Sequence, residues 1–325
     1  MEQIMCDLGY RNIGFPCLVC SNKILGFVIT LLSMIKVCFK LRSGDILIIQ
    51  YPLKKYYTLL CNIVHYRGAK VITLIHDLGS FRRKRLTVLQ EIDRLQNSDY
   101  LITLNDSMSA WLQTKGCEVP KGELKIWDYL SPAIVLNKIE PATDYTVVYA
   151  GALGYNKNRF LYELDRLPRQ WHLSVYGKGL EADKKYFSYN GFLPADQLIS
   201  SVQGDFGLVW DGDSYEACTG NYGEYLRYNN PHKVSLYVRC HLPLIIWEKA
   251  ALAPFIKEKE IGICINSLEE LDGKLEKLTV DDYFKMKSRV IEISNLLSVG
   301  YFFTKALDEA VKFLTKSDVA DEGRN

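Results

Sequence analysis

Short apolar runs rich in β-branched residues alternate with longer amphipathic runs along most of the 325-residue chain. The apolar runs are typical of buried parallel strands, and the amphipathic runs have the spacing of surface helices. The predicted strands are residues 45–51, 69–76, 99–105, 146–151, 171–177, 206–210, 243–247 and 261–266. The predicted helices include residues 84–96, 107–115, 195–201, 231–240 and 268–278. Strands separated by helices predict an α/β fold with parallel sheets and right-handed crossovers.

The alternation breaks once, at residues 132–144, where two prolines occur in a stretch without a clear period. This break predicts a linker between two α/β domains. The predicted boundaries are 1–140 for the first domain, 141–298 for the second, 299–316 for a C-terminal helix and 317–325 for a disordered tail. The chain opens on a predicted helix, MEQIMCDLGYRNIG, rather than on the strand with which Rossmann-like domains usually begin.

Composition excludes some classes of protein. The formal net charge is +2, so no domain-wide basic field for nucleic acid is expected. The nine cysteines are an odd number and most lie in apolar runs, which favours free thiols in a reducing cytoplasm. Cys17 and Cys20 form a CxxC, but no second pair follows at zinc spacing, so no zinc site is expected.

The segment 24–39 is apolar but too short to span a bilayer, and lysines bound and interrupt it. A packed helix is therefore predicted there. A membrane-surface role stays open beside it, because basic residues gather in the first third of the chain, with a solvated basic face as the alternative. These residues are Lys36, Lys40, Lys54, Lys55, Arg82, Arg83, Lys84 and Arg85.

Polar residues follow many of the predicted strands, where ligands bind in doubly wound sheets. They are Gln50–Pro52, His76, Asp77, Asn105 and Asp106 in the first domain, and residues 151–158, 176–178, 211–214 and 248–249 in the second. His76 and Asp77 are the sharpest candidates for acid–base chemistry. A core histidine and a loop cap are the alternatives for these two, and Asp106 is interpreted as a helix cap.

The stretch YNNPHKV predicts a helix that begins at Asn230, with Asn230 as its cap and Pro231 in the first turn. Lys233 then adds a cation at the positive end of a helix dipole, which favours an anionic ligand such as phosphate; a solvent-exposed lysine is the alternative. The preceding residues 220–231 are rich in Gly, Asn and Tyr, and predict a mobile or ligand-ordered loop.

A second anion contact is predicted after residues 146–151, where Gly151 permits close backbone approach and Lys157 and Arg159 supply cations. Neither a GxGxxG nor a GxxxxGK[ST] motif is present, so neither NAD nor ATP is favoured by motif. The two predicted phosphate-facing elements of the second domain favour a nucleoside diphosphate instead. Asp211 and Asp213 have the spacing of a metal-binding pair, but a turn explains them equally well.

Together these segments resemble the GT-B sugar-nucleotide glycosyltransferases, which have two facing Rossmann-like domains with a cleft between them and a C-terminal helix that returns to the first domain. The chain is most similar to bacterial O-antigen β-1,6-galactofuranosyltransferases and, more distantly, to the glucosyltransferase of streptococcal serine-rich adhesins. The segments that carry the resemblance are DLGYRNIG, LIHD, IWDYL, VVYAGAL, residues 206–238, LPLIIWEKAALAPFI, IGICINSLEEL and GYFFTKAL.

The resemblance implies that Tyr176 lies against the nucleotide and that Asn230 and Lys233 hold its phosphates. It also implies donor or acceptor contacts from Tyr10, Arg11, Asp211, Asp213, Glu224 and His232. The relatives often carry an arginine at the position of Tyr155, whereas here the cations come later. Glu216 and Glu224 have the Glu-x7-Glu spacing of retaining relatives, but they precede the phosphate helix, and the match is interpreted as chance.

The implied activity is inverting transfer of a hexosyl group, with galactofuranosyl first and glucosyl next, onto a lipid-linked glycan in the cytoplasm or at the inner face of its membrane. No metal and no cofactor beyond the UDP-sugar is implied. A non-catalytic sugar-nucleotide binder and a sugar-nucleotide epimerase stay open as alternatives. Lys233→Ala is expected to weaken UDP binding with little loss of stability, and Asp77→Asn to reduce transfer while sparing UDP binding.

Overall fold

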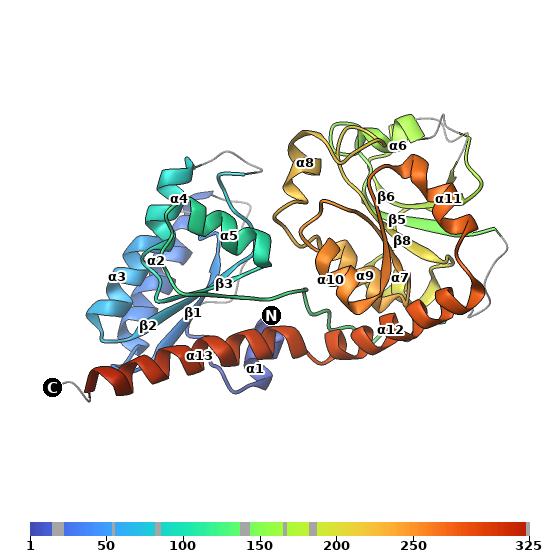
Figure 1. The fold of residues 1–325 in the computed structure, drawn as a ribbon. Helices are drawn as coiled ribbons and strands as arrows, with labels where there is room; N and C mark the ends of the chain where they lie inside the picture. The colour runs from blue at the N-terminus through green and yellow to red at the C-terminus, as the bar shows by residue number, and fades with distance from the viewer. Residues whose placement is uncertain are drawn as a thin grey trace. The chain divides into compact units, whose positions relative to one another are not determined.

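The structure is a computed structural model that describes residues 1–14, 23–53, 56–81, 86–136, 144–164, 168–181 and 187–322. It divides into two compact units. Unit 1 comprises residues 1–104, 109–124 and 303–325, and unit 2 comprises residues 105–108 and 125–302. Figure 1 shows a sheet with helices against it in each unit.

Unit 1 contains a four-stranded parallel sheet in the order β1-β2-β3-β4. Its strands are β1 (Ile46–Tyr51), β2 (Lys70–Ile75), β3 (Tyr100–Thr103) and β4 (Lys121–Glu123). Its helices are α1 (Glu2–Asp7), α2 (Lys23–Lys40), α3 (Tyr57–Tyr66), α4 (Val88–Leu95), α5 (Asp106–Thr114, whose first turn is grouped with unit 2) and α13 (Tyr301–Glu322). The strands β2 and β3 are almost wholly buried, as expected for the centre of a parallel sheet.

Unit 2 contains a six-stranded parallel sheet in the order β10-β9-β8-β5-β6-β7. Its strands are β5 (Thr146–Ala152), β6 (His172–Lys178), β7 (Ser188–Tyr189), β8 (Phe206–Val209), β9 (Leu244–Trp247) and β10 (Gly262–Ile265). Its helices are α6 (Arg159–Leu164), α7 (Ala195–Ser201), α8 (Gly220–Tyr225), α9 (His232–Arg239), α10 (Ala253–Lys259), η1 (Leu268–Glu270), α11 (Leu271–Glu276) and α12 (Val280–Ser298). Counted within the unit, this is the order 3-2-1-4-5-6 of a doubly wound sheet, and its direction reverses between β5 and β8.

All eight predicted strands are present, and their ends agree with the prediction to within two residues. The sequence reading missed β4 and β7, which are three and two residues long and are not fully buried. Short polar strands carry no apolar run, so the pattern that found the others could not find these. The prediction that the opening residues form a helix is confirmed for Glu2–Asp7, which is α1, but the helix does not continue to residue 14.

The segment just after β4 belongs to unit 2, although the predicted boundary lay at residue 140. The indole N–H of Trp127 donates to the carbonyl of Asn230 at 2.9 Å, and Ser235 Oγ donates to the carbonyl of Trp127 at 2.6 Å. These bonds fix the segment to the start of α9. Residues 137–143, which make up much of the predicted linker, lie outside the described residues.

The last two helices are separated at Gly300, whose φ of 76° lies in the left-handed region. Residues from Phe303 onward are grouped with unit 1. Lys70 Nζ donates to the carbonyl of Leu314 at 3.3 Å, and the rings of Tyr100 and Phe313 lie 5.4 Å apart. The helix α13 extends to Glu322, six residues beyond the end predicted at residue 316.

Seven of the cysteines are within the described residues, and all seven are free. Four of them are buried: Cys61, Cys117, Cys218 and Cys240. Cys17 and Cys20 lie outside the described residues, as do the basic residues at 54–55 and 82–85. No helix among the described residues is long and apolar enough to cross a membrane.

Candidate functional site

The loops that follow β5 and β8 meet where the sheet of unit 2 changes direction. The N–H of Gly212 donates to the carbonyl of Lys157, and the N–H of Phe160 donates to the carbonyl of Gly212, both at 3.2 Å. Gly212 has a φ of 112°, and a Cβ there would lie 2.1 Å from the carbonyl oxygen of Thr219. Only glycine fits this turn. Ligands of doubly wound sheets bind outside the strand ends at such a switch point.

The helix α9 is fastened over this point by Tyr237. The strands β5 and β8 pair only at Val147 and Val148, and the N–H of Ala150 donates to Tyr237 Oη at 2.7 Å instead of to β8. Gly207 of β8 makes room for the same side chain, because a Cβ at this position would lie 2.3 Å from the Tyr237 ring. Lys233, four residues before Tyr237, shares its helix face and is thereby held at the same end of β5.

Lys233 lies in a buried cluster with Asp211 and Tyr149. Its ammonium donates to Asp211 Oδ1 at 2.9 Å, to Tyr149 Oη at 3.1 Å and to the carbonyl of Trp210 at 3.3 Å. Tyr149 Oη donates to Asp211 Oδ1 at 3.1 Å. The side chains of Lys233 and Asp211 are each only 9% exposed. Lys233 is therefore not the solvent-exposed lysine that the sequence left open.

The electrostatics of the cluster follow from its burial. Burial lowers the pKa of Lys233, Asp211 opposes that shift, and Lys157 adds to the lowering. Burial and Asp211 raise the pKa of Tyr149 well above its usual value, so its hydroxyl stays protonated. Lys157 Nζ lies 3.9 Å from Asp211 Oδ1 and is 31% exposed. Two ammonium groups thus share one carboxylate, which leaves positive charge to attract an anion.

The start of α9 differs from the prediction. The N-cap is Pro231, with ψ of 131°, and not Asn230. The Asn230 side chain is buried and points elsewhere: Nδ2 donates to the carbonyl of Lys125 at 3.1 Å, and Oδ1 accepts from Asn105 Nδ2 at 2.7 Å. Asn230 therefore fastens the segment before α9 and does not cap the helix. His232, the first helical residue, stacks on Trp127 with ring centroids 5.0 Å apart.

A similar exchange of roles occurs at α5. The interpretation of Asp106 as a helix cap is wrong, because Asn105 Oδ1 accepts the N–H of Met108 at 2.9 Å and so occupies the cap position. Asp106 is the first helical residue and is 81% exposed. Its carboxylate lies 3.5 Å from Lys125 Nζ.

Residues 220–230 are more regular than predicted, since they begin with the short helix α8. Gly220 has a φ of 73°, and a Cβ on Gly223 would lie 2.4 Å from the backbone of Cys218, so both glycines are needed for this packing. Glu224 of α8 is 53% exposed and accepts from Arg227 Nε at 2.6 Å. Asp213 is exposed, whereas Asp211 is buried in the cluster.

The loop after β5 has its close backbone approach at a different glycine from the one predicted. Gly151 has room for a Cβ, whereas a Cβ on Gly177 of β6 would lie 1.8 Å from the carbonyl oxygen of Gly151. Asn158 Nδ2 donates to the carbonyl of Ala152 at 2.5 Å and closes the loop. Arg159 begins α6, where its Nε lies 3.2 Å from Glu163.

Tyr176, the predicted nucleotide contact, lies on β6 opposite Ala150 and is 8% exposed. It lines a cavity of about 490 Å³ together with residues such as Ser174, Asn190 and Asp205. None of the cluster residues lines this cavity. The role of Tyr176 as a nucleotide contact therefore stays a prediction.

In unit 1, His76 and Asp77 directly follow β2 and are partly buried. The N–H of His76 donates to the carbonyl of Tyr51 at 2.9 Å, which extends the pairing of β1 and β2 by one residue. The loop therefore leaves the sheet at Asp77. This places both side chains at the carboxyl end of β2, where chemistry is expected in a parallel sheet.

The loop that carries Asp77 is held by Glu91 of α4, a residue that the sequence reading missed. Its fully buried carboxyl group accepts from the N–H of Gly79 at 2.6 Å, the N–H of Ser80 at 2.9 Å and the hydroxyl of Tyr51 at 2.9 Å. Ser80 Oγ donates to it as well. Burial and Glu91 raise the pKa of Tyr51, which keeps that hydroxyl a donor. In the sequence, Glu91 lies within the predicted helix 84–96, where a glutamate is expected on the solvent-exposed face.

Tyr10 and Arg11, the predicted acceptor contacts, line a cavity of about 1,090 Å³ in unit 1. Residues 45–50, mostly of β1, and residues 39–42, at the C-terminal end of α2 and just beyond it, also line it. Burial, with a smaller effect of Asp308, raises the pKa of Tyr10. Both polar and apolar surfaces face this cavity, as a sugar-binding site requires.

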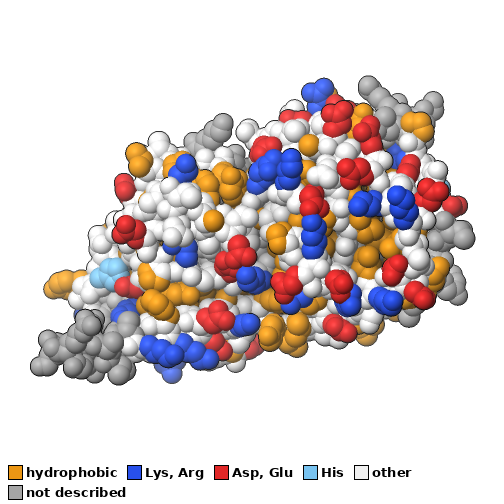
Figure 2. Space-filling view, viewed as in Figure 1, with side chains coloured by type: hydrophobic (Ala, Val, Ile, Leu, Met, Phe, Trp, Pro, Cys, Tyr) orange, Lys and Arg blue, Asp and Glu red, His pale blue; other side chains and the backbone are white. Residues whose placement is uncertain are grey.

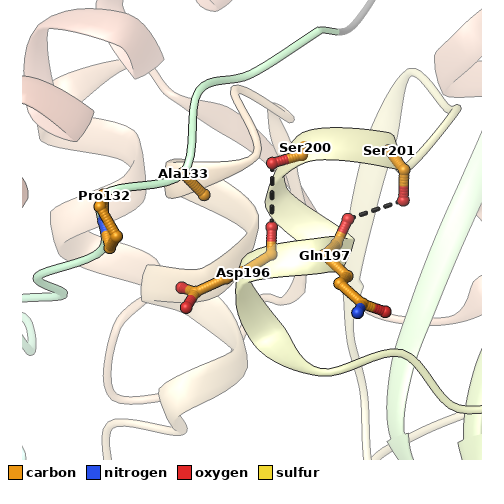
Figure 3. A pocket seen from close by; sticks show the side chains of 6 residues that line it. All are labelled: Pro132, Ala133, Asp196, Gln197, Ser200 and Ser201. Atoms are coloured by element: carbon orange, nitrogen blue, oxygen red, sulfur yellow. Dashed lines mark hydrogen bonds between the residues drawn. The ribbon is translucent and has the colours of Figure 1, made fainter.

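A third cavity, of about 530 Å³, lies in unit 2 between Pro132 and α7 (Figure 3). Two serines face it, but each hydroxyl donates to its own helix: Ser200 Oγ to the carbonyl of Asp196 at 3.1 Å and Ser201 Oγ to that of Gln197 at 2.6 Å. These groups are satisfied locally, so this cavity is not a candidate for catalysis. Among the described residues, no three His, Cys, Asp or Glu side chains are grouped to hold a metal ion.

Comparisons with known proteins define the class. Solved structures share the fold at low sequence identity: HepE from Anabaena in complex with UDP has a TM-score of 0.56 at 11% identity, covering 89% of this chain and 84% of that one. The HepE complex with UDP-glucose has a TM-score of 0.55 at 12% identity, covering 97% and 88%. The fold is that of the GT-B glycosyltransferases.

Family sequence profiles then identify the family. The profile "Glucosyltransferase 3-like, N-terminal domain" matches residues 1–126, and "Glucosyltransferase 3-like, C-terminal domain" matches residues 147–310. The chain belongs to this glycosyltransferase family. It is 29% identical over 306 residues to the β-1,6-galactofuranosyltransferase WbbI of Escherichia coli K12, covering 93% of this chain and 90% of WbbI. It is 28% identical over 280 residues to glucosyltransferase 3 of Streptococcus gordonii, covering 82% and 79%.

Proposed function

We propose that the protein transfers a hexosyl group from a UDP-sugar to a sugar hydroxyl, with UDP-galactofuranose as the donor and a lipid-linked intermediate of a cell-surface polysaccharide as the acceptor. The observation that carries this proposal is the cluster at the switch point of unit 2, where Lys233 and Lys157 share the carboxylate of Asp211. An excess of positive charge there suits the diphosphate of a nucleotide sugar. Two similarities support this donor: the relative WbbI is named a galactofuranosyltransferase, and the structurally similar HepE was solved in complex with UDP.

The proposed reaction is an inverting displacement. A base takes the proton from the acceptor hydroxyl, and the acceptor oxygen forms a bond to the anomeric carbon on the face opposite UDP. The bond from the anomeric carbon to the β-phosphate oxygen breaks, and its electron pair leaves with UDP. We assign the base to Asp77, with His76 as the second candidate, because both follow β2 on the loop that Glu91 holds.

The remaining predicted residues take supporting roles in this proposal. Lys157 and Lys233 stabilise the negative charge that develops on the leaving diphosphate. Arg159, at the start of α6, has a side chain that is 52% exposed, so we place its positive charge at the solvent-facing edge of the phosphate site. Tyr10 and Arg11 line the cavity in unit 1 that would receive part of the acceptor. No metal ion is assigned a role.

A thermal-shift series tests the donor class. The protein is heated with UDP, GDP, CMP, TDP, NAD and ATP, each with and without EDTA. Selective stabilisation by UDP that survives EDTA is expected. Stabilisation by another nucleotide alone would overturn the assignment of UDP, and dependence on a divalent cation would overturn metal independence.

Transfer is then tested with UDP-galactofuranose, UDP-glucose and UDP-galactose on glycan acceptors. Transfer of galactofuranose with inversion, read from the anomeric proton coupling of the product, is expected. Glucosyl transfer is the second candidate, and the match to glucosyltransferase 3 of Streptococcus gordonii favours it. Binding of UDP without turnover of any donor would identify a non-catalytic partner subunit, and turnover without an acceptor would identify an epimerase.

A further inference from the structure

The helix α2 exposes apolar side chains where a surface helix usually exposes polar ones. Its inward face includes Met34 and Val37, which are 6% and 7% exposed. The opposite face carries a stripe of five apolar residues with exposed fractions of 38% to 84%. This α2 stripe consists of Val28, Leu31, Leu32, Ile35 and Phe39.

The spacing of the α2 stripe is that of a single helix face, since its members follow one another at intervals of three, one, three and four residues. In a monomeric surface helix this face is polar, and a contiguous exposed apolar face marks a site of interaction. Phe39, at 84% exposure, is the most exposed of the five. The stripe is thus too regular to be a scatter of single surface residues.

Positive charge borders the stripe. Lys36, Lys40 and Arg42 follow the helix toward its C-terminal end, and Lys36 Nζ donates to the carbonyl of Gly14 at 3.1 Å. Lys40 and Arg42 are exposed beside Phe39, at the C-terminal end of the helix. On the face drawn in Figure 2, by contrast, acidic and basic side chains are interspersed. Asp45, just beyond Arg42, accepts the backbone N–H of Arg42 at 2.8 Å, whereas Lys40 and Arg42 place two exposed cations at this end of the stripe. An apolar stripe flanked by exposed cations is complementary to an anionic lipid surface.

We propose that the α2 stripe docks unit 1 onto an anionic membrane, with α2 lying in the plane of the interface. The apolar side chains enter the boundary between headgroups and acyl chains, while Lys40 and Arg42 contact lipid phosphates. No helix among the described residues is long and apolar enough to cross a membrane, and the proposal accordingly lays α2 in the plane of the interface. The purpose of this docking rests on the proposed function: it would bring the transferase to a lipid-linked acceptor.

Vesicle co-sedimentation tests the proposal with the full chain. Wild-type protein is mixed with vesicles of phosphatidylcholine alone or with phosphatidylglycerol added. Binding to the anionic vesicles is expected, with a weaker interaction at high salt because lipid–cation attraction is screened. Absence of binding to anionic vesicles at low salt would overturn the proposal.

The double variant Leu32→Glu/Ile35→Glu is expected to reduce vesicle binding at least tenfold. It removes two apolar side chains that would be buried in the lipid, and it adds two negative charges that the anionic headgroups repel. The control is Leu89→Glu on α4, whose leucine is 73% exposed in the same unit and should not matter. Lys40→Glu/Arg42→Glu should reduce binding to anionic vesicles by roughly tenfold. Equal binding by the wild type and the Leu32→Glu/Ile35→Glu variant would overturn the proposal.

Two further measurements distinguish membrane docking from self-association and from a failure of the proposed nucleotide site. Light scattering after gel filtration reports self-association; a dimer that depends on the α2 stripe, without vesicle binding, would assign the stripe to a second copy and overturn the lipid docking. The UDP-induced thermal shift reports the nucleotide site and should be equal in the wild type and in the Leu32→Glu/Ile35→Glu variant. Loss of that shift in the wild type would count against the proposed function and not against the membrane surface.

Discussion

Each unit has a buried carboxyl group that bonds at a loop following a strand, Glu91 in unit 1 and Asp211 in unit 2, and the two groups are held differently. Glu91 in unit 1 accepts from two backbone N–H groups and the hydroxyls of Tyr51 and Ser80. Asp211 in unit 2 is paired with the ammonium of Lys233 and the hydroxyl of Tyr149. The first arrangement is built from neutral donors, and the second from a charge pair.

The difference indicates two kinds of work. Neutral donors from the loop backbone fix where the loop runs, so Glu91 determines the position of the chain that carries Asp77. A buried charge pair is costly unless its partners are complete, and a second cation beside it leaves charge for a ligand. Unit 1 thus uses its carboxyl group to position chemistry, and unit 2 uses its carboxyl group to hold cations.

The largest effect is expected from Lys233→Ala. This variant leaves Asp211 buried without its ammonium, which costs about 3–5 kcal/mol in the free energy of unfolding. Urea denaturation measures the loss. The sequence alone had led us to expect little loss of stability, and the burial of the pair reverses that expectation. The double variant Lys233→Met/Asp211→Leu should recover most of the stability but not UDP binding. Unchanged stability of Lys233→Ala would refute the buried pair.

Asp77→Asn should lower the rate of transfer about 10²- to 10⁴-fold, since a general base contributes that much. Urea denaturation and UDP affinity should be unchanged, because the proposed role of Asp77 begins only when the acceptor is present. Steady-state kinetics with saturating donor measures the effect, and His76→Gln run in parallel separates the two candidate bases. Full activity of Asp77→Asn would remove it as the base.

Glu91→Gln should cost about 1–3 kcal/mol of stability, because the amide cannot accept from all four donors and leaves a buried one unpaired. The rate of transfer should fall as the Asp77 loop shifts, while UDP affinity holds. Asp93→Asn is the matched control, since Asp93 is exposed on the same helix. If Glu91→Gln weakened UDP binding as much as transfer, the separation of roles between the two units would be wrong.

The smallest effect concerns pH. Burial lowers the pKa of Lys233 below its ordinary value in the folded protein, so the unfolded chain holds this proton more tightly. Stability from this group therefore rises as pH increases from the folded pKa toward the unfolded one. A bound diphosphate favours the protonated lysine, so UDP affinity should instead fall as pH rises through the folded pKa. Calorimetric titration across alkaline pH measures this, and an affinity that rises with pH would contradict it.

The sequence predicted the strands well because a buried parallel strand needs a continuous apolar run, such as DILIIQY at β1. It predicted where polar residues gather for the same reason, since the strand ends mark the ligand edge. In the structure, His76 and Asp77 follow the end of β2, and Asp211 follows the end of β8, as these apolar runs predicted.

The rest depended on contacts between distant segments. Asn230 has every local feature of a helix cap, but Asn105 and Lys125 claim its side chain. Glu91 is a glutamate in an amphipathic helix, and only the loop at Gly79 and Ser80 makes it a buried acceptor. A local pattern cannot report a partner that is 11 to 125 residues away.

The most direct test of the central claim is the affinity for UDP of Lys157→Ala, measured by calorimetric titration in EDTA. Lys157 is partly exposed and can be removed without opening the buried pair. We predict an affinity about tenfold weaker than that of the wild type, as expected for one charged contact to phosphate, and no change for Lys274→Ala, an exposed lysine on α11. Equal affinities of Lys157→Ala and the wild type would contradict a phosphate site at the switch point.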